Sequence, residues 1–207
     1  MRCIAGLDTP STGTLHIEAG ATAPTQLAMV FQEQALFPWM SVRENVRFLM
    51  HNSTRVARDQ VDNVCDTFLH KVGLQRFAQL YPHEISGGMR QRVSLIRSFA
   101  VQPDVLLMDE PFVFVDFQTK LALHELLLRI WQEAARTVVF VTHDIEEAVT
   151  LADRILVMSA HPGRIKGLYE VNLPRPRDAF ALRKTAAFTA LVNTLMDAMH
   201  DDMQRDL

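Results

Sequence analysis

Two acidic side chains directly follow an apolar run near the middle of the chain. Asp109 and Glu110 come after Val105–Met108 and just before Pro111. Such a run is typical of a strand buried in a parallel sheet, and ligands of open α/β sheets bind at the carboxyl ends of the strands. Asp109 is a hard oxygen ligand suited to Mg2+, and Glu110 is placed to polarise an attacking water. From this motif alone, an acidic pair that only caps the next turn is the alternative.

A serine followed by two glycines forms a candidate anion site. Ser86 precedes Gly87 and Gly88, and an apolar pattern with helical spacing follows them. A serine can cap a helix, and the N–H groups of the first helical turn attract phosphate together with the helix dipole. A capped surface helix without a ligand is the alternative, but a position 23 residues before Asp109 favours the anion site.

Two further polar side chains follow apolar runs. His143 comes after Val138–Thr142, and Gln32 comes after Leu27–Phe31. A histidine at a strand end can bond to a phosphate or a catalytic water, and it titrates near neutral pH. A packed structural histidine and a simple strand cap are the alternatives for these two residues. None of the eight histidines forms a zinc pattern with a cysteine or a second histidine.

Apolar runs separated by helical patterns predict the fold that must position these side chains. The pattern of four short apolar runs is typical of parallel strands buried on both faces. Helical segments between strands indicate right-handed crossover units in an α/β domain. The runs are 27–31, 105–108, 138–141 and 155–158, and the helical patterns between them cover 61–72 and about 121–135.

Residues 1–207 are predicted to form one domain with two distinct parts. Helical spacing without a strand pattern predicts a helical subdomain over 37–85. The segment 171–207 is expected to be a linker around Pro174 and Pro176, followed by one amphipathic helix from about 179 to 203.

The composition excludes several classes of protein. The 207 residues are 48% hydrophobic and 22% charged, as in an ordinary soluble domain. With 21 basic and 24 acidic residues and no block of like charge, no nucleic-acid partner is expected. Two cysteines are too few for a disulfide framework, so a reducing compartment is expected. No apolar run approaches the roughly 18 residues of a membrane span, and no secretory leader is seen, so a cytoplasmic location is predicted.

The ordered motifs resemble those of the ATP-binding cassette (ABC) ATPases over nearly the whole chain. The resemblance implies a P-loop NTPase-like α/β fold, with a parallel sheet core and an inserted helical subdomain, that binds ATP and Mg2+. It implies that Gln32 is the Q-loop glutamine, which senses the magnesium, and that Asp109 is the Walker B aspartate. These two residues are the metal candidates.

The remaining site residues take their roles from the same resemblance. The segment from Ser86 to Gln91, with Gly87 and Gly88, is similar to the signature motif, which contacts ATP held by the opposite subunit. Glu110 corresponds to the catalytic base. Asp116 corresponds to the D-loop aspartate, and His143 to the switch histidine.

A narrower likeness points to importers of nitrate, sulfonate, taurine and related small solutes. It is carried by residues 36–46, 158–165 and 173–177. The implied partners are transmembrane permease subunits, a second ABC ATPase subunit in a homo- or heterodimer and, indirectly, a solute-binding protein. The implied location is peripheral, on the inner face of the plasma membrane. Cassettes do not bind the solute, so its identity does not follow.

The family's phosphate loop is not present in this sequence. No G-x-x-x-x-G-K-[ST] string occurs in the 207 residues, although the family carries one a few residues before the position of Ile4. Loss of three charge-assisted hydrogen bonds to the phosphates would remove about 5–9 kcal/mol of binding free energy. This is comparable with the whole binding free energy of a micromolar complex, roughly 8 kcal/mol. The chain is therefore expected not to bind ATP productively in its own half-site. Because the strand before that loop is normally central in the sheet, the domain is expected to be incomplete at its N-terminus. Val105–Met108 is expected either to keep unpaired backbone groups or to form a new pairing.

The segment before Asp116 departs from the family pattern. Val113 and Phe114 stand where close relatives usually carry Gly and Ala. Larger side chains here add bulk at a subunit contact and disfavour a glycine-like backbone angle. A shifted contact is therefore expected.

Several functions remain compatible with these motifs. The leading hypothesis is an ATP-binding and hydrolysing importer subunit that is impaired without its phosphate loop. The alternatives are a non-catalytic partner that supplies its signature motif in trans and a non-functional gene remnant. A cassette protein of DNA repair or translation is disfavoured, because neither a long insertion nor a basic patch is seen.

Overall fold

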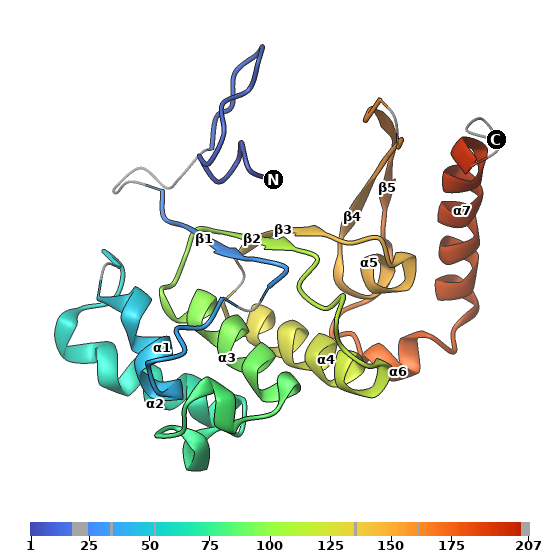
Figure 1. Cartoon of the computed structure of the whole chain (residues 1–207). Helices are drawn as coiled ribbons and strands as arrows, with labels where there is room; N and C mark the ends of the chain where they lie inside the picture. The colour runs from blue at the N-terminus through green and yellow to red at the C-terminus, as the bar shows by residue number, and fades with distance from the viewer. Residues whose placement is uncertain (18–24, 34, 52, 135, 161, 204–207) are drawn as a thin grey trace. The chain divides into compact units, whose positions relative to one another are not determined.

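The computed structural model describes residues 1–17, 25–33, 35–51, 53–134, 136–160 and 162–203 (Figure 1). The chain divides into two compact units. Unit 1 comprises residues 1–119 and 134–141, and unit 2 comprises residues 120–133 and those from 142 onward.

Unit 1 is built on a three-stranded parallel sheet. Its strands are β1 (Leu27–Val30), β2 (Val105–Asp109) and β3 (Thr137–Val141), in the order β1-β2-β3. Leu106, Leu107 and Met108 in β2 are fully buried. The predicted parallel α/β core is confirmed.

Of the two outcomes expected for Val105–Met108, the structure shows a paired strand and not unpaired backbone groups. Leu106 lies opposite Ala28 of β1 and opposite Val138 of β3 in the parallel register. As the strand buried along almost its whole length, β2 occupies the middle of the sheet, where both edges of its backbone are bonded. Among the described strands of this sheet, β1 and β3 each pair along one edge.

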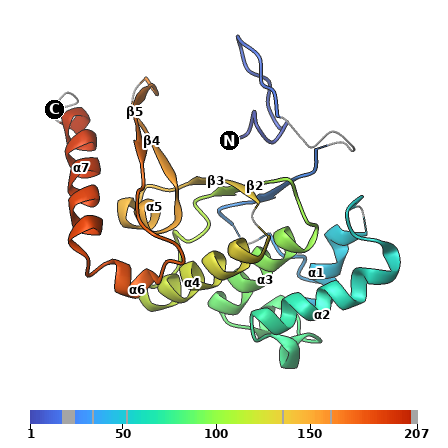
Figure 2. The same cartoon turned by 180° about the vertical axis from the view of Figure 1, so that it is seen from behind.

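The described part of unit 1 also contains three complete helices. They are α1 (Val42–Met50), α2 (Val61–Lys71) and α3 (Gly87–Ala100), and short 3-10 turns occur at 58–60, 75–77 and 82–84. A reciprocal capping box between Ser41 and Glu44 starts α1, and Gly73 at φ +70° follows the end of α2. α3 contacts α1, α2 and β1 and runs along one face of the sheet in both views (Figures 1 and 2).

The described part of residues 37–85 contains helices and no strand, as expected. These helices belong to the same compact unit as the sheet. A separate helical subdomain with these bounds therefore stays a prediction.

Unit 2 contains most of α4 (Phe117–Ala134), then α5 (Ile145–Leu151), an antiparallel hairpin and two final helices. The hairpin pairs β4 (Arg154–Met158) with β5 (Ile165–Glu170). Its inner face packs with α5 and the last helix into one core. That core consists of Val149, Val157, Val171, Leu173, Leu182, Phe188, Val192 and Leu195.

The structure corrects two strand predictions. Burial on both faces was expected for all four apolar runs, but both ends of β3 are exposed and Val157 is the one buried residue of β4. β4 pairs antiparallel with β5 among the described residues rather than joining the parallel sheet. β5 was missed, because Lys166, Gly167 and Glu170 interrupt its apolar character.

The single terminal helix expected from 179 to 203 is two helices, α6 (Ala179–Leu182) and α7 (Ala186–Met203). The break falls at Thr185, whose hydroxyl donates to the Leu182 carbonyl and accepts from the Phe188 N–H at 3.2 Å. A threonine in this position ends one helix and caps the next. No described helix is long and apolar enough to cross a membrane. Residues 204–207 lie outside the described part.

Candidate functional site

The carboxyl ends of β1 and β2 bring two oxygen-bearing side chains to one edge of the sheet. Val30 pairs with Met108, so Gln32, two residues after β1, and Asp109, the last residue of β2, lie at neighbouring strand ends. Asp109 is half-buried and Gln32 is exposed. A carboxylate and an amide oxygen are hard ligands that fit Mg2+, which keeps several waters and uses substrate phosphates. The described residues contain no cluster of three His, Cys, Asp or Glu that could hold a metal by itself.

Glu110 has an unusual backbone conformation. Its φ is +44°, a region that costs an L-residue about 1–2 kcal/mol. Its N–H donates to the Val141 carbonyl at 2.9 Å, which ties the residue to the end of β3. The strain therefore occurs at the residue predicted to be the general base, and the sheet holds it in place.

The predicted anion site lies at the start of α3. The Ser86 hydroxyl accepts from the Met89 N–H at 3.3 Å and caps the helix, which confirms that expectation. Ser86 and Gly87 are exposed. A Cβ on Gly88 would lie 3.0 Å from the Thr119 Cγ2, so a close approach of two segments requires a glycine there.

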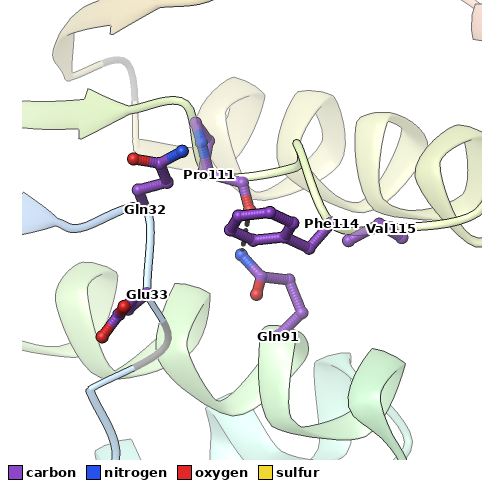
Figure 3. Close-up of a pocket in the computed structure, with 6 residues that line it drawn as sticks. All are labelled: Gln32, Glu33, Gln91, Pro111, Phe114 and Val115. Carbon is purple, nitrogen blue, oxygen red and sulfur yellow. Dashed lines mark hydrogen bonds between the residues drawn. The ribbon is translucent and has the colours of Figure 1, made fainter.

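Gln91 faces the protein interior rather than the helix N-terminus. Its side chain is 2% exposed, and its Nε2 donates to the Pro111 carbonyl (Figure 3). The hydrogen bond connects α3 to the segment that follows Glu110. The Gln91 amide is thus bonded inside unit 1. Contact of Gln91 with a nucleotide stays a prediction.

A pocket of about 210 Å³ lies beside this hydrogen bond (Figure 3). Its walls come from the segment after β1, from α3 and from the segment after β2. The lining residues are Gln32, Glu33, Gln91, Pro111, Phe114 and Val115. Two predicted site residues, Gln32 and Gln91, thus line the same pocket as Phe114, the aromatic residue that departs from the family pattern.

The segment between β2 and α4 exposes apolar side chains. Phe114 is 79% and Phe117 61% exposed, whereas Phe112 is 1% exposed and its ring lies 5.9 Å from that of Phe140. Asp116 accepts from the Thr119 N–H at 3.1 Å, and hydrogen bonds from Thr119 lower its pKa. Asp116 thus starts α4, and its role towards a second subunit stays a prediction.

His143, in unit 2, is exposed in the turn before α5. Asp144, the next residue, accepts from the Glu147 N–H at 3.2 Å as the cap of α5 and from Lys120 Nζ at 3.1 Å. Partial burial tends to raise the pKa of Asp144, but the hydrogen bonds from Lys120 and the Glu147 N–H outweigh it and lower the pKa.

The turn that carries His143 rests on residues that lie outside the sequence motifs. Glu147 is 3% exposed and accepts from the Thr142 hydroxyl, and His124 Nε2 lies 2.8 Å from its Oε1. Lys120 and His124 are four residues apart on α4, a spacing that places both on one helix face. This spacing was the available signal, but their partners follow 24 and 23 residues later.

The arrangement in unit 1 fits phosphate chemistry. The oxygens of Asp109 and Gln32 are suited to a metal ion, and the constrained carboxylate of Glu110 is suited to a water. The helix N-terminus capped by Ser86 is suited to an anion.

The chain is similar to known proteins over most of its length. The family model described as ABC transporter matches residues 1–113. The nitrate import ATP-binding protein NrtD of Synechocystis sp. is 47% identical over 176 residues, which cover 84% of this chain and 66% of that protein. The aliphatic sulfonates import ATP-binding protein SsuB of Bacillus cereus is 42% identical over 179 residues, which cover 86% of this chain and 70% of that protein.

A solved structure is also similar. It is the dimeric post-hydrolysis state of the ATP-binding cassette MJ0796 bound to ADP and Pi, with a TM-score of 0.69 and 27% identity. The match covers 84% of this chain and 79% of that one.

Proposed function

Because this chain belongs to the ABC transporter family, among relatives that include nitrate and sulfonate import ATP-binding proteins, we propose that it is the ATP-binding subunit of an importer for a small solute of that kind. Its proposed partners are transmembrane permease subunits and a second ABC ATPase subunit. Its proposed location is the inner face of the plasma membrane, bound through the permease. ATP and Mg2+ are the proposed ligands.

One observation carries the proposal. Parallel pairing of β1 with β2 and of β2 with β3 brings the predicted metal candidates and the predicted base to one edge of the sheet. The Glu110 N–H bond to Val141 holds the base there in its constrained conformation. Enzymes of this type act by positioning and by electrostatic stabilisation, for which rigid strand ends are well suited.

The proposed roles of the residues are those that the resemblance to the family implies. Bound Mg-ATP would supply the phosphoryl group that is transferred to water. Asp109 and Gln32 would orient the metal through their oxygens. Glu110 would accept a proton from the attacking water at its carboxylate, and His143 would donate a hydrogen bond to a phosphate oxygen.

We further propose that the 207-residue chain alone does not hydrolyse ATP. No G-x-x-x-x-G-K-[ST] string is present in it to supply the backbone donors, the lysine and the hydroxyl ligand that hold the phosphates. Calorimetric titration with Mg-ATP is expected to show no binding tighter than about 1 mM, and phosphate release is expected to equal the blank. Stoichiometric binding at micromolar concentration would overturn this part of the proposal.

A second candidate function is supply of the anion site in trans. The exposed Ser86 and Gly87 at the capped end of α3 favour it. The test mixes the chain with an intact nitrate-type cassette whose own signature serine is replaced. The wild-type chain should restore ATP turnover, and Ser86→Arg should not. Thr189→Arg, on the exposed surface of α7, is the matched control, and equal turnover with both variants would contradict a role in trans.

A further inference from the structure

Unit 2 contains a chain of buried and half-buried polar side chains that the proposed chemistry does not use. His124 is fully buried, and its Nε2 lies 2.8 Å from Glu147 Oε1. The other carboxylate oxygen, Oε2, accepts from the Thr142 hydroxyl. The same hydroxyl accepts from the Asp144 N–H at 3.0 Å. The hydrogen bonds thus connect α4 through α5 to both neighbours of His143.

A second connection runs from the same face of α4 to the same turn. Lys120 Nζ donates to Asp144 Oδ2 at 3.1 Å, and the side chains of this pair are 19% and 31% exposed. Lys120 and His124 differ by four positions, about one helical turn. One face of α4 therefore holds both neighbours of His143. Lys120 bonds to Asp144 directly, and His124 reaches Thr142 through Glu147.

The burial of these groups points to positioning. A carboxylate removed from water is costly unless each oxygen is bonded, and an apolar pair of the same volume often stabilises a core as well or better. A fully bonded buried network instead favours one geometry. Here both Glu147 oxygens are bonded, and the network ends on the turn that presents an exposed imidazole.

We propose that Lys120 and His124 are positioning residues that fix the direction of the His143 side chain through Asp144 and through Glu147 and Thr142. The functional value of this direction rests on the proposed role of His143 towards phosphate. The positioning itself is a property of the folded chain.

The test reads His143 directly in the full 207-residue chain. The imidazole Cε1–H signal, assigned by its loss in His143→Gln, is recorded by NMR together with hydrogen exchange of the Asp144 N–H. His124→Met should shift the signal towards that of an unstructured peptide and accelerate the exchange roughly ten- to a hundredfold, as for loss of one hydrogen bond to a charged group. His124→Gln, whose amide replaces the Nε2–H donor, should restore both values.

A second pair of variants covers the case in which His124→Met does not fold. Thr142→Val keeps the shape but removes the hydroxyl, and Thr142→Ser keeps the hydroxyl. The valine variant should show the same two changes and the serine variant should not. Lys166→Met, which removes an exposed lysine bonded to the Ala198 carbonyl, is the control for loss of a charge in unit 2.

The outcome is decided without any measurement of ATP turnover. An unchanged His143 signal and unchanged Asp144 exchange in folded Thr142→Val would overturn the positioning role. Failure of the chain to restore turnover when mixed with a cassette would overturn the proposed supply of the anion site in trans and leave these NMR results as they are, so the two failures are distinguishable.

Discussion

The turn after β2 and the turn after β3 both carry candidate catalytic groups, but different forces hold them. Glu110 is held mainly by backbone, through a positive φ and a bond to the Val141 carbonyl, with the Gln91 amide added one residue later. The turn at His143 is held by buried side chains from α4 and α5. The first turn thus depends on its backbone conformation and on single hydrogen bonds with β3 and α3, whereas the second depends on buried side chains of packed helices.

The two turns also differ in what surrounds the candidate group. Exposed aromatic rings follow Glu110, with Phe114 the most exposed at 79%. The turn at His143 is followed at once by a capped helix whose acidic residue Glu147 is buried. Substitutions that break one turn should therefore leave the other unchanged, and four experiments test this separation.

The largest effect is expected within the first turn. Phe112→Ala should lower the free energy of unfolding by about 3–5 kcal/mol, because it empties a fully packed site. Phe114→Ala, two residues away, should change it by less than about 0.5 kcal/mol, because its ring is in solvent. Urea denaturation measures both variants. A large loss in Phe114→Ala would show that this ring is buried in solution.

The next effect concerns the second turn. Glu147→Leu leaves two buried donors, from His124 and Thr142, without their acceptor, and should cost about 3 kcal/mol of unfolding free energy. Glu146→Leu is the matched control, since its partly exposed carboxylate pairs with Arg183 and is worth less than about 1 kcal/mol. Equal losses for the two variants in urea denaturation would contradict the contrast.

A smaller effect is expected where one side chain supports the first turn. Gln91→Met keeps the volume but removes the donor to the Pro111 carbonyl, so it should cost about 1–3 kcal/mol and speed hydrogen exchange at Phe112 and Val113. Arg92→Met removes a half-exposed side chain that bonds to the Val72 carbonyl at 3.3 Å, and it should leave these amides unchanged. Mass-resolved exchange decides between the two outcomes.

The smallest effect is a shift of acid titration. Asp144 has a lowered pKa, so its contribution to stability is present above the unfolded pKa of about 4 and is lost as the pH falls through the folded value. Lys120→Met removes one of the groups that lower this pKa, so the pKa should rise and the loss should begin at higher pH. The pKa of Asp116, lowered by Thr119, should not move. Carboxyl NMR titration reads both, and a parallel shift would contradict independent turns.

The first turn was largely predictable from the sequence, because its residues are close in the chain and end an apolar run. The pattern around Asp109 and the cap at Ser86 needed only local rules. The positive φ of Glu110 was not predictable, because glutamate has no preference for that region and the sheet imposes it. The inward direction of Gln91 depends on where α3 lies on the sheet, which helical spacing does not determine.

The second turn could be located from the sequence but its support could not. A histidine after an apolar run marks the position of His143. The partners of Glu147 and Asp144 come from a helix that precedes them by more than 20 residues, and their choice follows from packing. Similarly, a threonine inside a helical pattern does not by itself predict the end of a helix. Thr185 separates α6 from α7 because its hydroxyl donates to the Leu182 carbonyl, which lacks a helical partner.

The positive φ of Glu110 lowers the stability of the fold at the residue proposed to be the base. Glycine is the residue that adopts a φ of +44° without strain, so replacing Glu110 by glycine would relieve about 1 kcal/mol while keeping the N–H bond to Val141. Selection for folding alone would therefore drive this position towards loss of the carboxylate. The carboxylate at this position therefore comes at a cost in stability, and Glu110→Gly is expected to give a more stable fold that lacks the proposed base.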